Sequence, residues 1–402
     1  MATEPGSPPE ALRAFHPAPG IPLGQRRRAL LALAGWGAWA LTPRPAWAHN
    51  PGSSVQLAAA WELQGSFHIG LLSTTEGAGQ ALQVHDALGV PTRAHGLCVL
   101  PGGAVLATAR RPGDWLVRWQ PGQGTEPQWL WQDGARSFNG HVLPSPDGRQ
   151  IYTTETDADT GASWVAVRDA RTLEKTAEWP THGIDAHELV WDMRNTASGA
   201  PTLLVANGGV PTAPETGRAK RALHTMDSSL VRLDARTGRQ LGQWRLEADP
   251  RLSLRHLAWS PDAHTLGIAL QAEHDDHALK NAAPVLALFD GNMLRTVAAP
   301  EPVAPRLQGY GGSMAATPTG WAVSCPRAHG IALFSLQGTW QGLVLLPEAC
   351  PLAVHGSVLW AGGLAGSLQN AQAPAPLMHP HGAGLQGARL DNHWVTAAPW
   401  QG

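Results

Sequence analysis

The sequence predicts an all-β protein, a seven-bladed β-propeller of the YVTN/WD40-like type. A unit of four short strands recurs at a spacing of roughly 40–50 residues, which is typical of propeller blades. Glycine and proline are abundant, at 45 and 34 of 402 residues, as expected for a chain with many turns. Charged residues make up only 15% of the chain, while hydrophobic residues make up 43%, enough for a large buried core.

The first 48 residues have the pattern of an export signal. Arg26, Arg27 and Arg28 precede an apolar run from Ala29 to Leu41, and Ala46-Trp47-Ala48 follows as a cleavage site. The arginines and the long polar lead-in predict a twin-arginine signal peptide over residues 1–48. The alternative is an uncleaved membrane anchor. We therefore expect a periplasmic protein with no membrane association after cleavage, whose residues 49–402 form a single propeller domain.

The clearest copy of the repeat begins at His141. His141-Val142-Leu143 predicts a first strand, Pro146-Asp147-Gly148 a turn, and residues 150–154 a second strand. Residues 163–169 and 175–179 are the predicted third and fourth strands. Four consecutive strands joined by short turns form one antiparallel blade.

Five further copies follow the same plan. They begin at His95, His187 and His256, and in weaker form at Ser313 and Cys350. Their predicted second strands are residues 105–108, 203–207, 266–270, 321–324 and 358–361.

The two ends of the domain complete each other. The N-terminal part supplies three strands without a first one, at residues 55–61, 67–73 and 81–86. The C-terminal residues 391–397 predict a first strand, carrying His393, with nothing after it. Pairing of these ends gives a seventh blade and closes the ring, which leaves no open sheet edge.

Several segments along the chain resemble one known family, the periplasmic propellers of domain-of-unknown-function family 1513. The matching segments are Ala109–Gly113, Gly140-His141, Tyr152–Glu155, Thr181–Ile184, Val205–Gly209, Met226–Leu230, Arg255–Leu257 and Asp391–His393. Asp227 stands where the family often has Glu. The family has no established activity. Its genes tend to lie near imelysin-like iron-regulated proteins and di-haem peroxidase-like proteins, so the resemblance implies a link to iron uptake and partners of these kinds.

Histidine marks the start of the first strand in five of the seven units. Because the first strand of a blade is innermost, His95, His141, His187, His256 and His393 should surround the mouth of the channel, together with Cys350. Neutral imidazoles bind first-row transition metals, which predicts an iron, copper or zinc site, and a Cys350 thiolate would favour copper or zinc. Two alternatives stay open. Each histidine could instead hydrogen-bond the backbone or a neighbouring blade, or the ring could bind an anionic ligand directly.

Other polar residues are expected at the same end of the ring. Arg110, Arg111, Asn207 and Gln271 lie at the ends of second strands and form a candidate ligand-binding set. The two arginines, with Arg327, could hold a carboxylate or phosphate, or could form inter-blade salt bridges. Glu155 and Asp157 are candidates for a catalytic acid and base, although no partner residue is evident.

Three smaller signals also have two interpretations each. Cys325 and Cys350 could form a disulfide in the periplasm, which would remove Cys350 as a ligand. The segments Glu273–His277 and His379–His381 could bind a cation or could be ordinary polar loops. Many of the 18 tryptophans fall at strand positions, which predicts packing between blades.

Composition and motifs leave three classes of function. A net charge of -2 excludes a generally basic nucleic-acid binder. The sequence has no G-x-S-x-G elbow, P-loop or haem-attachment motif. We favour a monomeric, non-enzymatic metal-binding or metal-delivery protein for iron or copper acquisition. The alternatives are a metal-dependent lactonase-like hydrolase or oxidoreductase, and an interaction scaffold with a structural histidine ring.

Overall fold

A computed structural model of the chain describes residues 54–75, 80–194, 201–211 and 222–397. All of them belong to one compact unit, Ala48–Gly402. The predicted signal peptide, residues 1–48, lies outside the described residues and stays a prediction.

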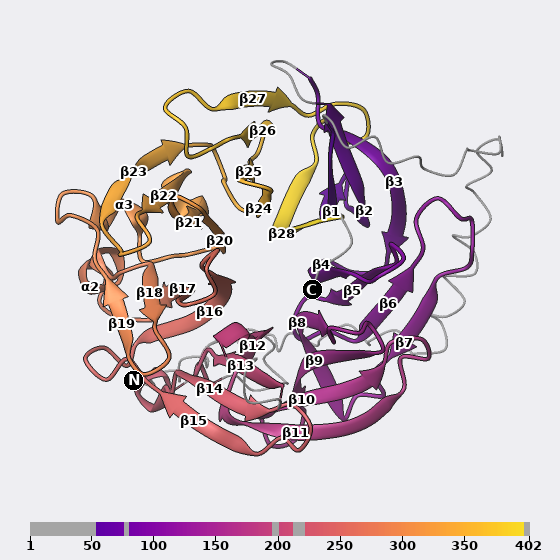
Figure 1. Cartoon of the computed structure of the whole chain (residues 1–402), viewed down its shortest axis with the longest axis horizontal. Helices are drawn as coiled ribbons and strands as arrows, with labels where there is room; N and C mark the ends of the chain where they lie inside the picture. The colour runs from indigo at the N-terminus through magenta and orange to yellow at the C-terminus, as the bar shows by residue number, and fades with distance from the viewer. Residues whose placement is uncertain (1–53, 76–79, 195–200, 212–221, 398–402) are drawn as a thin grey trace, which may run out of the picture. The chain divides into compact units, whose positions relative to one another are not determined.

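The described residues form seven four-stranded antiparallel sheets around a common centre (Figure 1), which confirms the predicted propeller. The strand nearest the centre comes first in each of the following sheets. The blade that contains both ends of the domain is β28 (Arg389–Thr396), β1 (Ser54–Leu63), β2 (Ser66–Thr75) and β3 (Gln83–Val90). The next is β4 (Ala94–Val99), β5 (Val105–Ala109), β6 (Trp115–Trp119) and β7 (Gln128–Trp131). The third is β8 (Arg136–Pro144), β9 (Gln150–Asp157), β10 (Ala162–Asp169) and β11 (Lys175–Ile184).

The remaining four sheets follow in chain order. They are β12 (Ala186–Trp191), β13 (Thr202–Asn207), β14 (Ser229–Asp234) and β15 (Gln240–Trp244); then β16 (Leu252–Trp259), β17 (Leu266–Ala272), β18 (Leu286–Phe289) and β19 (Leu294–Val297). The last two are β20 (Ser313–Thr317), β21 (Gly320–Cys325), β22 (Gly330–Phe334) and β23 (Trp340–Leu345), and β24 (Leu352–His355), β25 (Val358–Gly362), β26 (Gly366–Gln369) and β27 (Leu377–Pro380).

The ring closes as the sequence predicts, by pairing of its two ends. Strand β28 pairs antiparallel with β1, with Leu57 opposite Thr396 and Ala59 opposite Trp394. The first described strand and the last one therefore share a sheet, and β28 covers the edge of β1 that faces the centre.

Recurrent turn chemistry explains the regular hairpins. In the turn between β8 and β9, Ser145 donates to the Asp147 carboxylate at 2.6 Å, and the Gln150 amide donates to the Ser145 hydroxyl at 2.9 Å. Ser260, Asp262 and Thr265 repeat this arrangement between β16 and β17. Short polar side chains that bond nearby backbone fix these turns and hence the register of the strands they join.

The core lies between neighbouring blades, and tryptophan indoles bond across these boundaries. The Trp191 indole on β12 donates to the Pro144 carbonyl on β8 at 2.8 Å. The Trp259 indole on β16 donates in turn to the Trp191 carbonyl on β12, also at 2.8 Å. Ile69 and Ala58 of the closing blade pack against Val105 and Trp115 of the next. The prediction that tryptophans pack between blades is confirmed for these positions.

Helices are short among the described residues. They are the 3-10 turns η3 (Leu223–Thr225) and η4 (Pro326–Ala328) and the helices α2 (His277–Ala282) and α3 (Ala304–Leu307). None of the helices in the described part of the chain has the length and apolar character needed to cross a membrane.

Candidate metal centre

A bulge occurs at the histidine of each of the five histidine-bearing inner strands. The strand register shifts between Ala94 and Leu97, Phe138 and Val142, Ala186 and Leu189, Leu254 and Leu257, and, on β28, Leu390 and Trp394. The pairings of β20 and β24, which carry no such histidine, run without a shift. A bulge adds an unpaired residue and redirects side chains, so it can turn a histidine out of the sheet and toward the centre of the ring.

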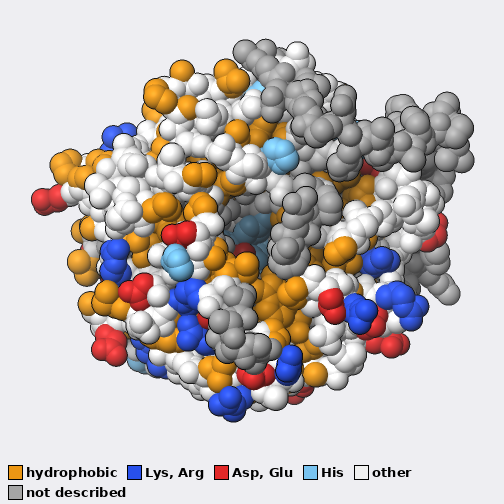
Figure 2. Space-filling model, viewed as in Figure 1, with side chains coloured by type: hydrophobic (Ala, Val, Ile, Leu, Met, Phe, Trp, Pro, Cys, Tyr) orange, Lys and Arg blue, Asp and Glu red, His pale blue; other side chains and the backbone are white. Residues whose placement is uncertain are grey.

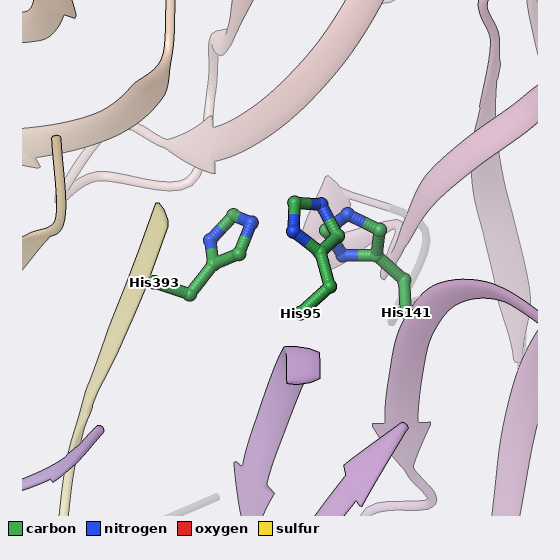
Figure 3. A group of neighbouring side chains, drawn as sticks. All are labelled: His95, His141 and His393. Carbon is green, nitrogen blue, oxygen red and sulfur yellow. The ribbon is translucent and has the colours of Figure 1, made fainter. Parts of the chain in front are cut away.

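The five histidines meet at the centre of the ring. We call His95, His141, His187, His256 and His393 the histidine cluster. Nine pairs among these rings have centroids 4.6 to 5.9 Å apart. Figure 3 shows three of them, reaching from neighbouring inner strands toward one point. In Figure 2, histidine side chains lie inside the central hollow.

Two glycines make the close approach of the inner strands possible. A Cβ atom on Gly96 would lie 2.1 Å from the carbonyl oxygen of Gly140 on the next blade. Gly140 itself has φ +100°, and a Cβ there would lie 2.7 Å from Cδ2 of His95. Both positions precede or follow a cluster histidine in sequence, so the backbone around the histidines accepts no side chain without displacing the cluster.

The cluster leaves many polar atoms without a hydrogen bond. Both ring nitrogens of His95, Nε2 of His141 and His393, and Nδ1 of His187 and His256 are buried and have no hydrogen-bond partner. One contact joins two rings, between Nε2 of His187 and Nε2 of His256 at 3.4 Å. A buried polar atom without a partner costs about 1–3 kcal/mol. The alternative is that each histidine serves only to hold the blades together through hydrogen bonds to the backbone. At these six ring nitrogens such bonds are missing.

Burial keeps the cluster histidines neutral. Desolvation, followed by His393 and Arg110, lowers the pKa of His95 well below its usual value of 6.5. Desolvation, followed by the neighbouring cluster histidines, likewise lowers the pKa values of His141 and His187 well below 6.5. Desolvation is again the main cause for His256 and His393, whose pKa values fall to about 3. Neutral imidazole is the form that binds a metal ion.

Sequence reasoning missed one candidate ligand, Glu188. Its Oε2 accepts a hydrogen bond from the Leu257 amide at 2.8 Å and lies 3.4 Å from Nδ1 of His256. Leu257 directly follows the bulge on β16, and its amide is reached by Glu188 of the neighbouring blade. Desolvation raises the pKa of Glu188 to about 7. The sequence signal was the acidic residue directly after His187, which occurs in no other copy of the repeat.

Three overlapping groups of side chains have the spacing of metal ligands. They are His95 with His141 and His393, His95 with His187 and His256, and His141 with Glu188 and His256. Within each group the candidate ligand atoms lie within 4.8 Å of one another. The 3.4 Å between the two Nε2 atoms of His187 and His256 is close to the roughly 3.3 Å expected for two nitrogens bound tetrahedrally to one ion at about 2.0–2.1 Å.

A small cavity of about 20 Å³ lies beside the cluster. His95, His187 and His256 form part of its wall. The rest of the wall consists of Arg110, Arg111, Arg255, Gln271, Tyr310 and Asn392. The structure thus brings Arg110, Arg111 and Gln271 of the predicted ligand-binding set to the histidines. It adds Arg255, which sequence reasoning did not select although it directly precedes His256.

Other predicted site residues are engaged away from the cavity. Asn207 is buried and donates to the Thr181 carbonyl at 3.2 Å and to Ser229 at 3.3 Å. Cys350 precedes β24 instead of starting it, and none of the metal-ligand groups among the described residues includes it. Desolvation raises the pKa of Cys350 to about 12, so the thiol is protonated at neutral pH. All three cysteines are free, which excludes a Cys325–Cys350 disulfide in this structure.

The two candidate catalytic carboxylates form ion pairs elsewhere. Glu155 is fully buried and bonds Arg168 at 2.7 Å. Asp157 pairs with Arg136 at 2.8 Å and accepts bonds from Thr160 in its own turn. Neither belongs to the cavity wall, so the geometry gives them no shared reaction site.

The remaining histidine-rich segments and Arg327 are also apart from the cluster. In the loop before α2, Asp276 caps that helix and His274 bonds Asp249 at 3.1 Å, so the ligand-type side chains point to separate partners. His379 lies on β27, an outermost strand, and bonds Gln80 and Gln369. The Arg327 guanidinium lies 4.1 Å from the centre of the Tyr310 ring and does not line the cavity.

Replacing Gly140 by alanine is expected to displace His95 and to weaken metal binding by about 10-fold or more, an effect comparable to the loss of an outer-shell partner. The new Cβ would lie 2.7 Å from the His95 ring. Titration of the purified variant with Zn²⁺ measures the change. Gly134→Ala is the matched control, since Gly134 has φ +103° but open space around it. Equal affinities for Gly140→Ala and Gly134→Ala would show that the contact with His95 does not position the cluster.

Comparison with known proteins places the chain in a family and shows its fold. The model of the family described as "Protein of unknown function (DUF1513)" matches residues 88–397. No curated protein sequence matches. Among solved structures, hydrazine synthase of Kuenenia stuttgartiensis is similar at 14% identity and a TM-score of 0.51, over 74% of this chain and 89% of that one. A streptogramin B lyase is similar at 10% identity and a TM-score of 0.52, over 73% and 85%. At these identities the likeness concerns the fold alone.

Proposed function

Because the chain belongs to the DUF1513 family, whose description names no activity, we propose from the site itself that the protein binds one first-row transition-metal ion at the histidine cluster. The observation that carries this proposal is the convergence of five imidazoles, four of them on buried residues, with six buried ring nitrogens that lack a hydrogen-bond partner. A bound metal would occupy such lone pairs and offset the cost of burying them.

The donor set favours a borderline metal ion. Imidazole suits zinc, copper, iron and nickel, and the absence of Cys350 from the ligand groups argues against a site for soft Cu(I). His141, Glu188 and His256 make up a set of two histidines and one carboxylate, which is typical of Fe(II) sites with open positions. We therefore propose iron as the biological metal, with copper or zinc as alternatives that bind the same ligands.

The wider role follows from the family resemblance and the N-terminal segment. We propose that the protein is exported by the twin-arginine route and acts in the periplasm as a monomeric accessory protein in iron acquisition. Imelysin-like and di-haem peroxidase-like proteins are the proposed partners. Delivery of the ion would require partner access to the central hollow, where the cluster lies.

The two other classes of function receive less support from the site. A cavity of about 20 Å³ is far below the roughly 300–1,000 Å³ of typical small-molecule sites, so a lactone would not fit beside the cluster without rearrangement. A purely structural histidine ring would be expected to satisfy its ring nitrogens, and six of them have no partner.

Metal content tests the proposal. Protein isolated from the periplasm, or reconstituted anaerobically with Fe²⁺, is expected to hold about one equivalent by elemental analysis. The double variant His95→Gln/His256→Gln removes a member from each of the three ligand groups. It should bind metal more than about 100-fold more weakly, since even an outer-shell partner contributes about 10- to 100-fold.

The matched control is His274→Gln/His277→Gln, which removes one histidine from the loop before α2 and one from the first position of that helix. This variant should keep its metal. Wild-type protein that stays metal-free after reconstitution would refute the proposal and favour the scaffold. Retention of metal by a folded cluster variant would place the ion elsewhere.

A further inference from the structure

The small cavity beside the histidine cluster contains a buried guanidinium with unused hydrogen-bond donors. Arg255 is 1% exposed and lines the cavity. Its Nη2 binds the Asp185 carboxylate at 2.9 Å, while its Nε and Nη1 have no hydrogen-bond partner. Gly208 packs directly on this pair, because a Cβ there would lie 2.8 Å from Nη1 of Arg255. A buried charged donor without a partner is costly, so the site is built for a further acceptor.

The charges around the cavity point to an anion. Asp185 is shared between Arg255 and Arg111, so one carboxylate faces two guanidinium groups. Arg110 adds a third cation to the cavity wall. The cavity wall thus contains three arginines and no carboxylate, so positive charge is in excess there.

This excess of positive charge would oppose the binding of a metal ion at the histidine cluster. A divalent cation at the histidine cluster would stand close to three arginines, and like charges in a poorly solvated site repel strongly. An anion between the ion and the guanidinium groups would convert this repulsion into attraction, by accepting hydrogen bonds from arginine and coordinating the ion.

We propose that the cavity binds a small carboxylate-type anion, such as formate or bicarbonate, which Arg255 and Arg110 hold against the histidine cluster. Arg255 offers the planar donor geometry that carboxylates match. A cavity of about 20 Å³ exceeds the roughly 10–15 Å³ needed for one water, which suits a ligand of a few atoms. The existence of the anion site stands independently of the metal; only joint binding of anion and metal rests on the proposed function.

Calorimetric titration with sodium formate tests this inference, on metal-free and on Zn²⁺-loaded protein at constant ionic strength. Wild-type protein should bind one formate, and more tightly when loaded with metal. Arg255→Met should bind formate about 10-fold or more weakly, as expected for a lost charge-assisted hydrogen bond. Arg110→Gln, at a half-buried position, is a second variant in case Arg255→Met does not fold. Bicarbonate and citrate, titrated in parallel, distinguish a free small anion from the carboxylate of a larger chelator.

Arg245→Gln is the matched control. It removes the same charge from a surface pair with Asp227 and should bind formate like wild type. Absence of saturable binding to both forms of the wild type would overturn the inference, as would unchanged binding in folded Arg255→Met and Arg110→Gln. Formate binding that depends on Arg255 in a protein unable to bind metal would leave the anion site standing and refute the proposed metal function.

Discussion

Acidification from pH 7.5 to pH 5 is expected to lower the free energy of unfolding of the metal-free protein by about 4 kcal/mol through His256 and His393 alone. Burial lowers the pKa of both residues from 6.5 to about 3 in the folded state. Between these two values the unfolded chain takes up protons that the folded protein does not. Stability is therefore fully present above pH 6.5 and is lost progressively as the pH falls toward 3, by about 2 kcal/mol per histidine at pH 5.

Chemical unfolding of chelator-treated protein at pH 7.5, 6 and 5 measures this loss. His256→Gln should make the loss smaller by about 2 kcal/mol, because glutamine does not titrate. His264→Gln is the control, at an exposed turn position that should leave the pH dependence unchanged. A free energy of unfolding that does not change between pH 7.5 and 5 would contradict the burial of neutral imidazoles at the centre.

Metal binding is expected to stabilise the protein by about 2.7 kcal/mol when free metal exceeds its dissociation constant 100-fold, and by about 4.1 kcal/mol at 1,000-fold. The cluster assembles only when five inner strands, distant in sequence, meet at the centre of the ring. The unfolded chain has no such arrangement, so the binding energy contributes to folding stability. Chemical unfolding at pH 7.5 with and without Zn²⁺ measures the difference.

The same measurement on His95→Gln/His256→Gln should show little stabilisation by Zn²⁺. The loop variant His274→Gln/His277→Gln should be stabilised like wild type. If the cluster variant gained as much stability as wild type, the ion would have to bind somewhere other than the histidine cluster.

The seven-bladed ring could be predicted because the same sequence pattern recurs along the chain. Each copy combines a strand start, a turn with fixed side-chain bonds and a second strand, and the segments left at the two ends match as one blade. The meeting of the histidines also follows from the repeat, because equivalent positions of inner strands point to one axis.

The details of the site could not be predicted from the same pattern. A bulge at each histidine changes which side chains face the channel. The alternation of inward and outward side chains along a regular strand does not reveal where a bulge inserts an extra residue. Glu188 and Arg255 lie next to cluster histidines and would face the opposite side of a regular strand. Cys350 precedes its strand, whereas five of the other inner strands carry a histidine within the strand.

X-ray absorption at the metal edge of the loaded wild-type protein shows which kinds of side chain bind the ion. Nitrogen and oxygen neighbours are expected at about 2.0–2.2 Å, with the outer-shell scattering of imidazole rings. Loss of that imidazole signal in His95→Gln/His256→Gln would assign it to the cluster. Sulfur at about 2.3 Å, or a first shell without imidazole, would contradict a metal held by these histidines.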